Sequence, residues 1–296
     1  MFRRISVKVA VFVNLILICV MAIGTLLLVN QQWANMESRY QAGGKLMATF
    51  GAKAYARLLE EGVNANVISL DDVFDTKYVK FGSFDPPKYN TKFDAYTDRV
   101  MIDLLDEFMK NTNVVFAVGA DKNGYIPTHN SKYQRAITGD VEKDKVGNRA
   151  KRIFADPVGL KAAENRIEGF IQVYKRDTGE TMWDVASPIM VKGRQWGNFR
   201  VGLSIDELNR QKTEILYALL GIMSIILLIS VSAVILVVNF ILRPLTKFTK
   251  IASNLADGDV DVKIEVTSDD EIGDLGKVLE RMRISLKVAM DRLRKK

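Results

Sequence analysis

Two long apolar stretches alternate with polar regions along the chain. Residues 215–242 carry no charged side chain, and residues 9–29 are apolar except at Asn14, Gly24 and Thr25. A helix of either length can cross a hydrocarbon core of about 30 Å, so we expect two membrane spans. A cleaved signal peptide is the alternative for the first stretch. The apolar run is long for such a peptide, however, and no small-residue cleavage site follows it.

Positive charges predict the orientation of the two spans. Arg3, Arg4 and Lys8 precede the first span, and Arg243, Lys247 and Lys250 follow the second. The positive-inside rule places both ends in the cytoplasm. The sequence thus predicts a two-pass inner-membrane protein with, in order, a cytoplasmic N-terminus (1–8), a first span (9–29), a periplasmic domain (30–214), a second span (215–242) and a cytoplasmic C-terminal region (243–296).

The C-terminal region shows two helical patterns. Leu245, Phe248, Ile251 and Leu255 form one helical stripe, which Gly258 ends. Ser268 then opens a second helix, with Glu271 at the spacing of a capping box. Apolar residues recur in this helix at alternating steps of three and four, a seam that must be buried against another helix. The seam consists of Ile272, Leu275, Leu279, Met282, Leu286, Ala289 and Leu293.

Several separated elements of this region resemble a HAMP linker, the signal-relay module of bacterial transmembrane receptors. They are Pro244, the turn at residues 257–259, and Asp270-Glu271-Ile272-Gly273 with Leu275. The resemblance covers residues 243–293 and implies a parallel four-helix coiled coil in a homodimer. Pro244 and Gly258 would be its joints, Glu271 and Ile272 its relay contacts, and Leu275, Leu279, Met282 and Leu286 its dimer seam. An ordinary juxtamembrane coiled coil is the alternative.

The region between the spans predicts an α+β domain. A long helix begins after the first span, with a possible kink at Gly43-Gly44, and stops at residues 60–62. A loop-like stretch (63–90) and a second helix (93–108) follow. The remaining expected elements are a strand (114–118), an extended segment (125–130), a short helix (158–165), three antiparallel strands (170–174, 182–191 and 196–203) and a helix (205–212) that enters the second span.

Four segments of this domain resemble the Cache/PAS-like extracytoplasmic domains of bacterial chemoreceptors. They are DKNGYIPTHN (121–130), NRAKRIF (148–154), YKRDTG (174–179) and GRQWG (193–197). The resemblance covers residues 31–210. It implies a homodimeric sensor with a long N-terminal helix, an antiparallel sheet and a ligand pocket on that sheet.

Scarce histidine and cysteine restrict the chemistry. His129 and Cys19 are the chain's single histidine and cysteine, so a two-histidine metal site cannot form within one chain, and no Ser-His-Asp triad is recognisable around His129. We therefore expect no enzyme, no metal and no cofactor, including b-type haem bound through His129. The net charge of +7 lies largely at the membrane-flanking ends. It indicates attraction to anionic lipid and no binding to nucleic acid.

The candidate ligand-binding residues each have a plain structural alternative. His129 could contact a ligand or be a structural histidine. Arg149 and Arg152 could clamp an anion or lie in a solvated loop. Asp184 could bind an amine or face water. The aromatic candidates suit a half-apolar pocket but equally suit a core; they are Tyr125, Tyr174, Trp183 and Trp196.

Together these patterns predict a membrane receptor. A small molecule would bind the periplasmic domain, and the second span and HAMP region would pass a conformational signal to a cytoplasmic protein. That effector is expected to be separate, because no kinase, cyclase or methyl-accepting region is recognisable up to Lys296. The alternative is a dimeric assembly or adaptor protein whose periplasmic domain binds a protein partner.

Overall fold

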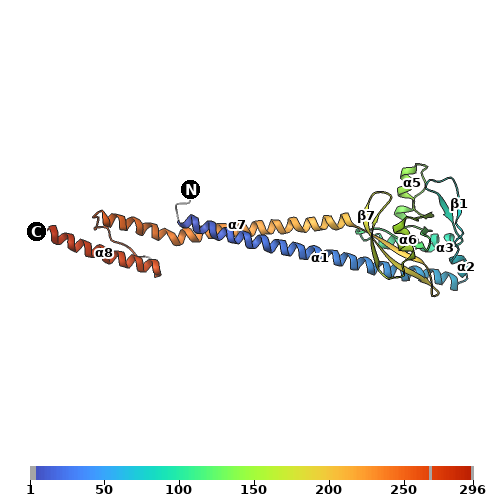
Figure 1. Ribbon diagram of the computed structural model, residues 1–296, viewed down its shortest axis with the longest axis horizontal. Helices are drawn as coiled ribbons and strands as arrows, with labels where there is room; N and C mark the ends of the chain where they lie inside the picture. Colours follow the sequence, from blue (N-terminus) through green and yellow to red (C-terminus); the bar gives the residue numbers. More distant parts are fainter. Residues whose placement is uncertain (1–4, 267–268, 295–296) are drawn as a thin grey trace. The chain divides into compact units, whose positions relative to one another are not determined.

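The computed structural model describes residues 5–266 and 269–294 of the chain. The chain divides into two compact units, residues 29–216 and residues 1–28 with 217–296. The first contains every strand among the described residues and is called the sheet domain here (Figure 1). The second is called the helical unit. The predicted combination of helices with an antiparallel sheet is confirmed.

A four-stranded antiparallel sheet forms the centre of the sheet domain. Its order is β3-β8-β7-β6, so the three late strands form the predicted meander and β3 is added beside β8. These strands are β3 (Val114–Asp121), β6 (Phe170–Lys175), β7 (Thr181–Val191) and β8 (Arg194–Ser204). Two short antiparallel pairs lie beside it: β1 (Val79–Phe81) with β2 (Lys88–Asn90), and β4 (Tyr125–Ile126) with β5 (Arg152–Ile153).

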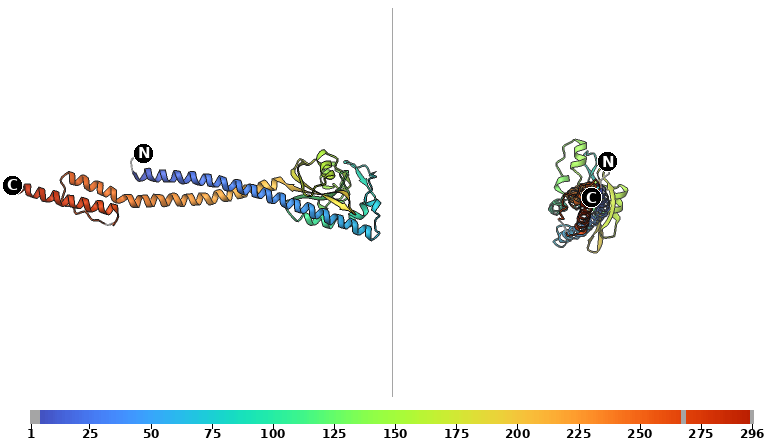
Figure 2. Two further views of the ribbon diagram at one scale, coloured as in Figure 1. Left: turned by 60° about the horizontal axis from the view of Figure 1, so that its bottom comes forward. Right: turned by 90° about the vertical axis from the view of Figure 1, so that its left-hand side faces the viewer.

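One face of the sheet packs on helix α1 (Ile5–Asn64). Figure 2 shows the ribbon of this helix running beside the strands. Val185 on β7 and the alternating Phe199, Val201 and Leu203 on β8 belong to the core on this side of the sheet. The core on the helix side includes Ala48, Ala52, Tyr55 and Leu59. The opposite face carries a smaller apolar cluster together with buried charged side chains. The candidate site lies on this second face.

The glycines of α1 serve close packing and produce no kink. The helix runs without interruption through Gly43 and Gly44. A Cβ atom on Gly44 would come within 2.5 Å of a Leu203 methyl carbon, and one on Gly51 within 2.2 Å of the Phe199 ring. The expected kink at Gly43-Gly44 is therefore wrong: Gly44 and Gly51 allow the helix backbone to approach the sheet, whereas a Cβ on Gly43 would meet nothing within 4 Å.

Short helices and loops surround the second face. The stretch predicted as a loop contains α2 (Leu70–Val73) as well as β1 and β2. The predicted helix over residues 93–108 is divided at Met101, although hydrogen bonds from Met101 N–H to Thr97 O and from Leu105 N–H to Met101 O continue across the division. The helical elements are α3 (Asp94–Val100), α4 (Ile102–Phe108), η1 (Ser131–Tyr133), α5 (Val141–Gly147) and α6 (Pro157–Glu164).

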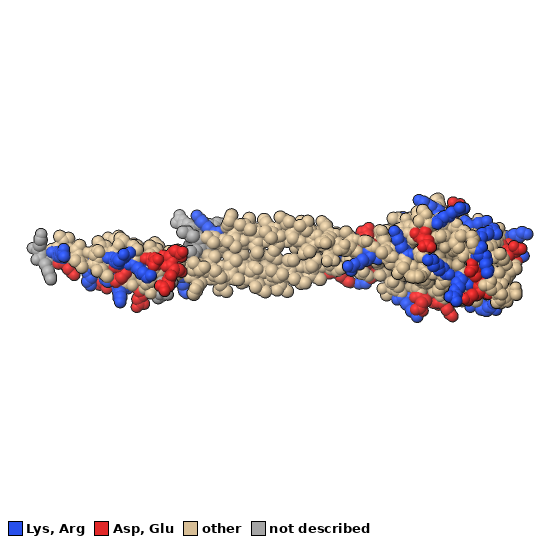
Figure 3. All heavy atoms as spheres, turned by 90° about the horizontal axis from the view of Figure 1, so that it is seen from below, with Lys and Arg blue, Asp and Glu red and all other residues tan. Residues whose placement is uncertain are grey.

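Two helices are long and apolar enough to cross a membrane. They are α1 and α7 (Ile205–Ala256), whose apolar stretches leave large side chains such as Leu26, Leu236 and Phe240 more than 60% exposed. Figure 3 shows no acidic or basic side chain over a broad part of this surface. Polar side chains here bond to their own helix, for example Thr25 to Met21 O at 2.8 Å. Such bonds satisfy polar groups where water is absent.

The end of α7 is defined by a glycine turn. Gly258 has φ +91° and donates its N–H to Leu255 O, and Asp259 N–H donates to Asn254 O. This is a Schellman motif, in which a left-handed residue closes the last helical turn. Helix α8 (Glu271–Arg294) begins with Asp270 accepting from the N–H groups of Ile272 and Gly273. The predicted capping residue, Ser268, lies outside the described residues.

Candidate functional site

A small hollow on the second face of the sheet is lined by charged and aromatic side chains. Its volume is about 20 Å³, room for little more than a water molecule. Its walls come from β3, β4, β6 and β8 and from the segments that follow β4 and surround β5. The lining residues are Phe116, Val118, Ile126, His129, Arg149, Phe154, Tyr174, Arg176 and Arg200.

Four buried arginines gather around this hollow. Arg149, Arg152, Arg176 and Arg200 have side chains only 3–8% exposed. Aromatic rings support them: Arg149 and Arg152 lie 4.9 and 4.8 Å from the Phe154 ring centre. Cations attract the faces of such rings. We call these four side chains the arginine cluster.

Three carboxylates face the arginine cluster. Arg200 makes two hydrogen bonds to Asp184, at 3.1 and 2.8 Å. Asp177 receives bonds from Arg149 at 2.7 and 3.3 Å and from Arg152 at 3.4 Å. Glu180 lies 3.0 Å from Arg176. Because an arginine side chain does not lose its charge in proteins, four fixed positive charges meet three negative ones.

The pKa shifts reflect this positive excess. Burial, followed by the charge of Arg149, lowers the pKa of Arg152 to about 10. Burial alone would raise the pKa of Asp177, but the hydrogen bond from Arg149 and the neighbouring arginine charges bring it below its usual value. The lowered pKa of Asp177 means that the arginine charges stabilise a carboxylate here despite its burial.

His129 is fully enclosed and neutral. Burial, and then the charges of Arg149 and Arg176, hold its pKa well below 6.5. Its Nδ1 accepts a hydrogen bond from Asn130 N–H at 2.9 Å, so the proton of the neutral ring is on Nε2. Among the described residues, no three His, Cys, Asp or Glu side chains gather to hold a metal ion.

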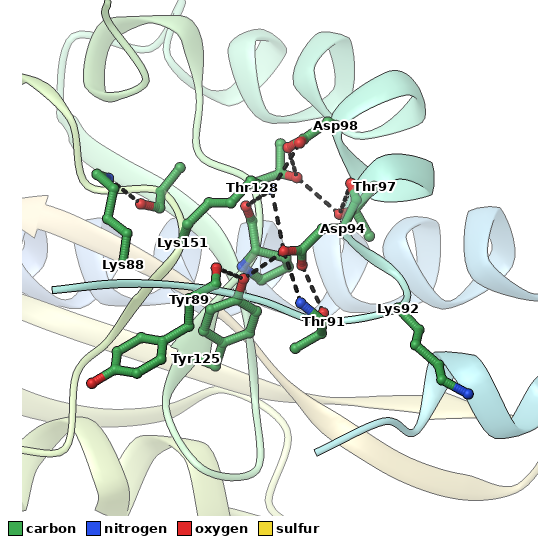
Figure 4. A network of polar contacts seen from close by, with 12 residues as sticks. Lys88, Tyr89, Thr91, Lys92, Asp94, Thr97, Asp98, Tyr125, Thr128 and Lys151 are labelled. Carbon is green, nitrogen blue, oxygen red and sulfur yellow. Dashed lines mark hydrogen bonds and ion pairs between the residues drawn. The ribbon is translucent and has the colours of Figure 1, made fainter. Parts of the chain in front are cut away.

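A left-handed residue brings Arg149 and Arg152 to the same side. In an extended chain, residues three apart point to opposite faces. Lys151 between them has φ +62°, which breaks that alternation. Its ammonium lies 2.7 Å from Asp98 and 3.4 Å from Asp94 of α3 (Figure 4). Lysine therefore holds a conformation that favours glycine, and its ion pairs with α3 fix it there.

Lys88 supports the same segment from β2. Its ammonium donates at 2.6 Å to both Asn148 Oδ1 and Ala150 O. Burial, and then the charges of Arg152 and Lys151, lower the pKa of Lys88 to about 8. The backbone that carries the two arginines is thus held by Lys88 from β2 and by the ion pairs of Lys151 with α3.

Lys151→Ala is expected to lower the melting temperature of the protein more than Lys151→Gly. Both variants lose the ion pairs to α3, but glycine adopts positive φ without strain. The free energy of unfolding should therefore be roughly 1 kcal/mol higher for the glycine variant than for the alanine variant. This corresponds to roughly 2–4 °C for a domain of 150–250 residues. Thermal unfolding of the two variants in detergent followed by tryptophan fluorescence checks this. Equal melting temperatures would show that residue 151 does not keep its left-handed conformation once the ion pairs are lost.

The structure brings together only some of the predicted ligand-binding residues. His129, Arg149 and Tyr174 line the hollow, and Arg152 and Asp184 are one contact behind it. Three others lie elsewhere.

The Tyr125 hydroxyl lies 2.7 Å from Asp94 and 2.8 Å from Tyr89 O, in the network of Figure 4. Trp183 and Trp196 belong to the core against α1, where the Trp196 indole donates to Val73 O at 2.8 Å. Strand alternation puts Trp183 on the face opposite Asp184. These three side chains do not line the hollow.

Sequence reasoning missed Arg176 and Arg200 at the hollow and Asp177 beside it. A signal for Arg200 exists, because Asn198 and Arg200 alternate with the apolar residues of an internal strand. For Arg176 and Asp177 the sequence indicates only a turn, since Arg149 and Arg152, the partners of Asp177, are 28 and 25 residues away.

The predicted relay residues lie in the helical unit. Pro244 is inside α7, which continues through it, and Gly258 forms the turn described above. Glu271 is exposed at the start of α8, while Ile272 packs on a cluster formed by Phe248, Leu255, Val260 and Ile264.

The predicted dimer seam divides into two parts. Leu279 packs on the same cluster, and Gly276 permits the close approach of Phe248, whose ring lies 2.9 Å from where a Cβ would be. By contrast Leu275, Met282 and Leu286 are 40–53% exposed. Part of the seam is therefore covered by the chain's own α7 and connector, and part is open to another helix.

Comparisons with known proteins agree with the C-terminal prediction. No curated protein matches the chain. The crystal structure of the E. coli DcuS sensor domain is similar at 18% sequence identity and a TM-score of 0.26, covering 38% of this chain and 71% of that chain. Residues 236–288 match the family model of the HAMP domain. The predicted HAMP region (243–293) is thus confirmed over residues 243–288, and the matched HAMP domain begins within the second long apolar stretch (215–242).

Proposed function

We propose that the sheet domain binds a small anionic molecule at the arginine cluster and that binding is relayed through α7 and the HAMP domain to a cytoplasmic signalling protein. The observation that carries this proposal is the burial of four guanidinium groups against three carboxylates. Guanidinium binds carboxylates and phosphates in a two-pronged geometry. The neutral His129, with its proton on Nε2, adds an uncharged donor for the same ligand.

The proposed relay needs a ligand that binds one conformation better than the other. A ligand with equal affinity for two states shifts neither, however tightly it binds. Arg200 lies on β8, and β8 is followed directly by α7. A change in the position of Arg200 on ligand binding is therefore passed to the start of α7 along a single strand.

The protein is proposed to lie in a bacterial inner membrane with the sheet domain in the periplasm. The basic residues that flank the apolar stretches support cytoplasmic termini and contact with anionic lipid. No cofactor, catalytic role or nucleic acid is part of the proposal. A reporter fused to the C-terminus tests the orientation, since periplasmic activity of that fusion would contradict it.

A homodimer is the proposed functional unit, and crosslinking of α8 tests it. In a Cys19→Ser background, Met282→Cys should form a disulfide between two copies, because the exposed seam residues would meet at the dimer axis. Lys277→Cys is the matched control, since it is exposed on the opposite side of the heptad. Equal crosslinking at both positions in native membranes would rule out a specific parallel seam.

Anion binding is tested on the full-length protein in nanodiscs. Sulfate, acetate, succinate and citrate are added while the melting temperature is followed. A ligand at 100 times its dissociation constant stabilises the folded state by about 2.7 kcal/mol, which raises the melting temperature by several degrees. Arg149→Met should abolish this shift, and Lys80→Met, which removes an exposed positive charge on β1, should not. No shift with any anion would overturn the proposal.

A protein partner is the second candidate, and an exposed apolar surface favours it. Leu46 and Phe50, one turn apart on α1, are 57% and 60% exposed, and Ile167 is 68% exposed. This surface suits either a second copy of the chain or another protein. If none of the anions changes the melting temperature while Phe50→Asp abolishes a complex captured in membranes, the adaptor function is favoured.

A further inference from the structure

The position of a ligand carboxylate is already occupied by a side chain of the protein. Asp177 places one oxygen 2.7 Å from Arg149 and the other 3.3 and 3.4 Å from Arg149 and Arg152. This is the two-pronged contact that a bound carboxylate would make. Asp177 thus already provides the contact that the proposed function assigns to an external anion.

Asp177 comes from a tight turn at the edge of the sheet. The turn joins β6, the outermost strand, to β7 and is closed by hydrogen bonds from Gly179 N–H to Arg176 O and from Arg176 N–H to Glu180 O. The same turn supplies Glu180, which lies 3.0 Å from Arg176. One short segment therefore provides two of the three carboxylates that neutralise the arginine cluster.

Within each of these ion pairs, the arginine is more deeply buried than the carboxylate. The side chains of Asp177 and Glu180 are 32% and 51% exposed, whereas those of Arg149 and Arg176 are 4% and 3% exposed. Because Asp177 and Glu180 are partly exposed, their carboxylates regain full hydration when they move into water. A buried guanidinium does not, and it needs another anion when the first one leaves.

We propose that Asp177 is a tethered competitor of the ligand, displaced together with the β6–β7 turn when an external anion binds the arginine cluster. This inference rests on the proposed function and adds what sets ligand specificity. The small hollow agrees with this, because about 20 Å³ holds no organic anion, so a ligand must take the place of a group that already pairs with the arginines.

Competition with a tethered group selects for ligands with several negative charges. Short flexible linkers give a tethered group an effective concentration in roughly the millimolar range, and the tight turn holds Asp177 closer still, so a monocarboxylate making the same contact must reach at least that concentration. A ligand with two carboxylates engages the Arg149–Arg152 pair and Arg176 together. After the turn leaves, Asp184 is the one carboxylate among the described residues that still forms an ion pair with an arginine of the cluster, which favours a dianion or a trianion.

The test measures succinate and acetate affinity by calorimetry on the full-length protein in nanodiscs. Asp177→Asn, which keeps the size of the side chain, should bind succinate about tenfold more tightly than the unmodified protein, and the gain for acetate should be at least as large. Asp103→Asn is the control, because Asp103 is an exposed carboxylate of α4 and its loss changes net charge equally. That control should leave both affinities unchanged.

A labelled turn gives a second measurement that does not depend on the stability of Asp177→Asn. A fluorophore on Thr178→Cys in a Cys19→Ser background should report increased exposure when succinate binds. Suppose that succinate binds through Arg149. If Asp177→Asn then binds succinate equally or more weakly, or if the turn label does not respond, Asp177 is not a tethered competitor, although the arginine cluster still binds anions. If neither protein binds an anion, both proposals fall.

Discussion

Asp184→Asn is expected to lower the melting temperature of the protein by roughly 6–20 °C. Asp184 and Arg200 are almost completely enclosed, and two hydrogen bonds join them. Removing one partner of a buried pair costs roughly 3–5 kcal/mol because the other charge stays in a poorly solvated place. For a domain of 150–250 residues, 1 kcal/mol corresponds to roughly 2–4 °C. Burial alone would lower the pKa of Arg200, but Asp184 raises it.

The double variant separates the loss of a pair from the loss of packing. Asp184→Leu with Arg200→Met removes both charges and should recover much of the stability, since apolar replacements of buried pairs are often neutral. Recovery will be incomplete because Gln172 donates to Asp184 at 2.9 Å and would lose its acceptor. Differential scanning fluorimetry of the three proteins checks this. A double variant no more stable than Asp184→Asn would mean that shape, and not charge pairing, dominates.

The second large expected effect is a pH dependence of anion affinity that arises from the protonation of His129. In the anion-free protein, burial and the arginine charges hold the His129 pKa well below 6.5. A bound anion offsets those charges and raises this pKa, so binding takes up a proton once the pH falls below about 6.5. Affinity for sulfate, which keeps its charge over this range, should therefore rise as the pH falls, by at most about tenfold per pH unit.

The stability of the anion-free protein should change in the opposite direction. Because the pKa of His129 is lower in the folded than in the unfolded state, its contribution to stability is complete above about pH 6.5 and is lost as the pH falls. His129→Gln should flatten both dependences between pH 5 and 7. Lys88, whose pKa is about 8, titrates above this range. An unchanged sulfate profile in His129→Gln would exclude His129 as the linked group.

Local patterns predicted most of the elements of this protein. Glycine turns and alternating apolar residues identify β6, β7 and β8, because a hairpin is specified by adjacent residues. The HAMP region was predicted from separated motifs that keep their order and spacing. The small pair β1–β2 was missed because each strand has three residues and shows little apolar alternation.

The site was only half predictable because its composition depends on pairing between distant segments. Arg149 and Arg152 attract attention as charges, but their shared direction depends on the left-handed Lys151 and its ion pairs to α3. Arg200 reaches Asp184 only because β7 and β8 pair in the register that places Ala186 opposite Arg200. Aromatic character could not separate Tyr174, at the hollow, from Trp183 in the core.

Ser204 affects how a displacement of β8 is transmitted to α7. It ends β8, its hydroxyl caps α7 by accepting Glu207 N–H at 3.0 Å, and its carbonyl accepts the Tyr40 hydroxyl of α1 at 2.9 Å. Strand and helix therefore join without slack, and the joint is anchored to the other long helix. One inserted residue would turn the emerging helix by about 100° and advance it by about 1.5 Å. The junction at Ser204 therefore sets the rotational position of α7 as well as the stiffness of its connection to β8.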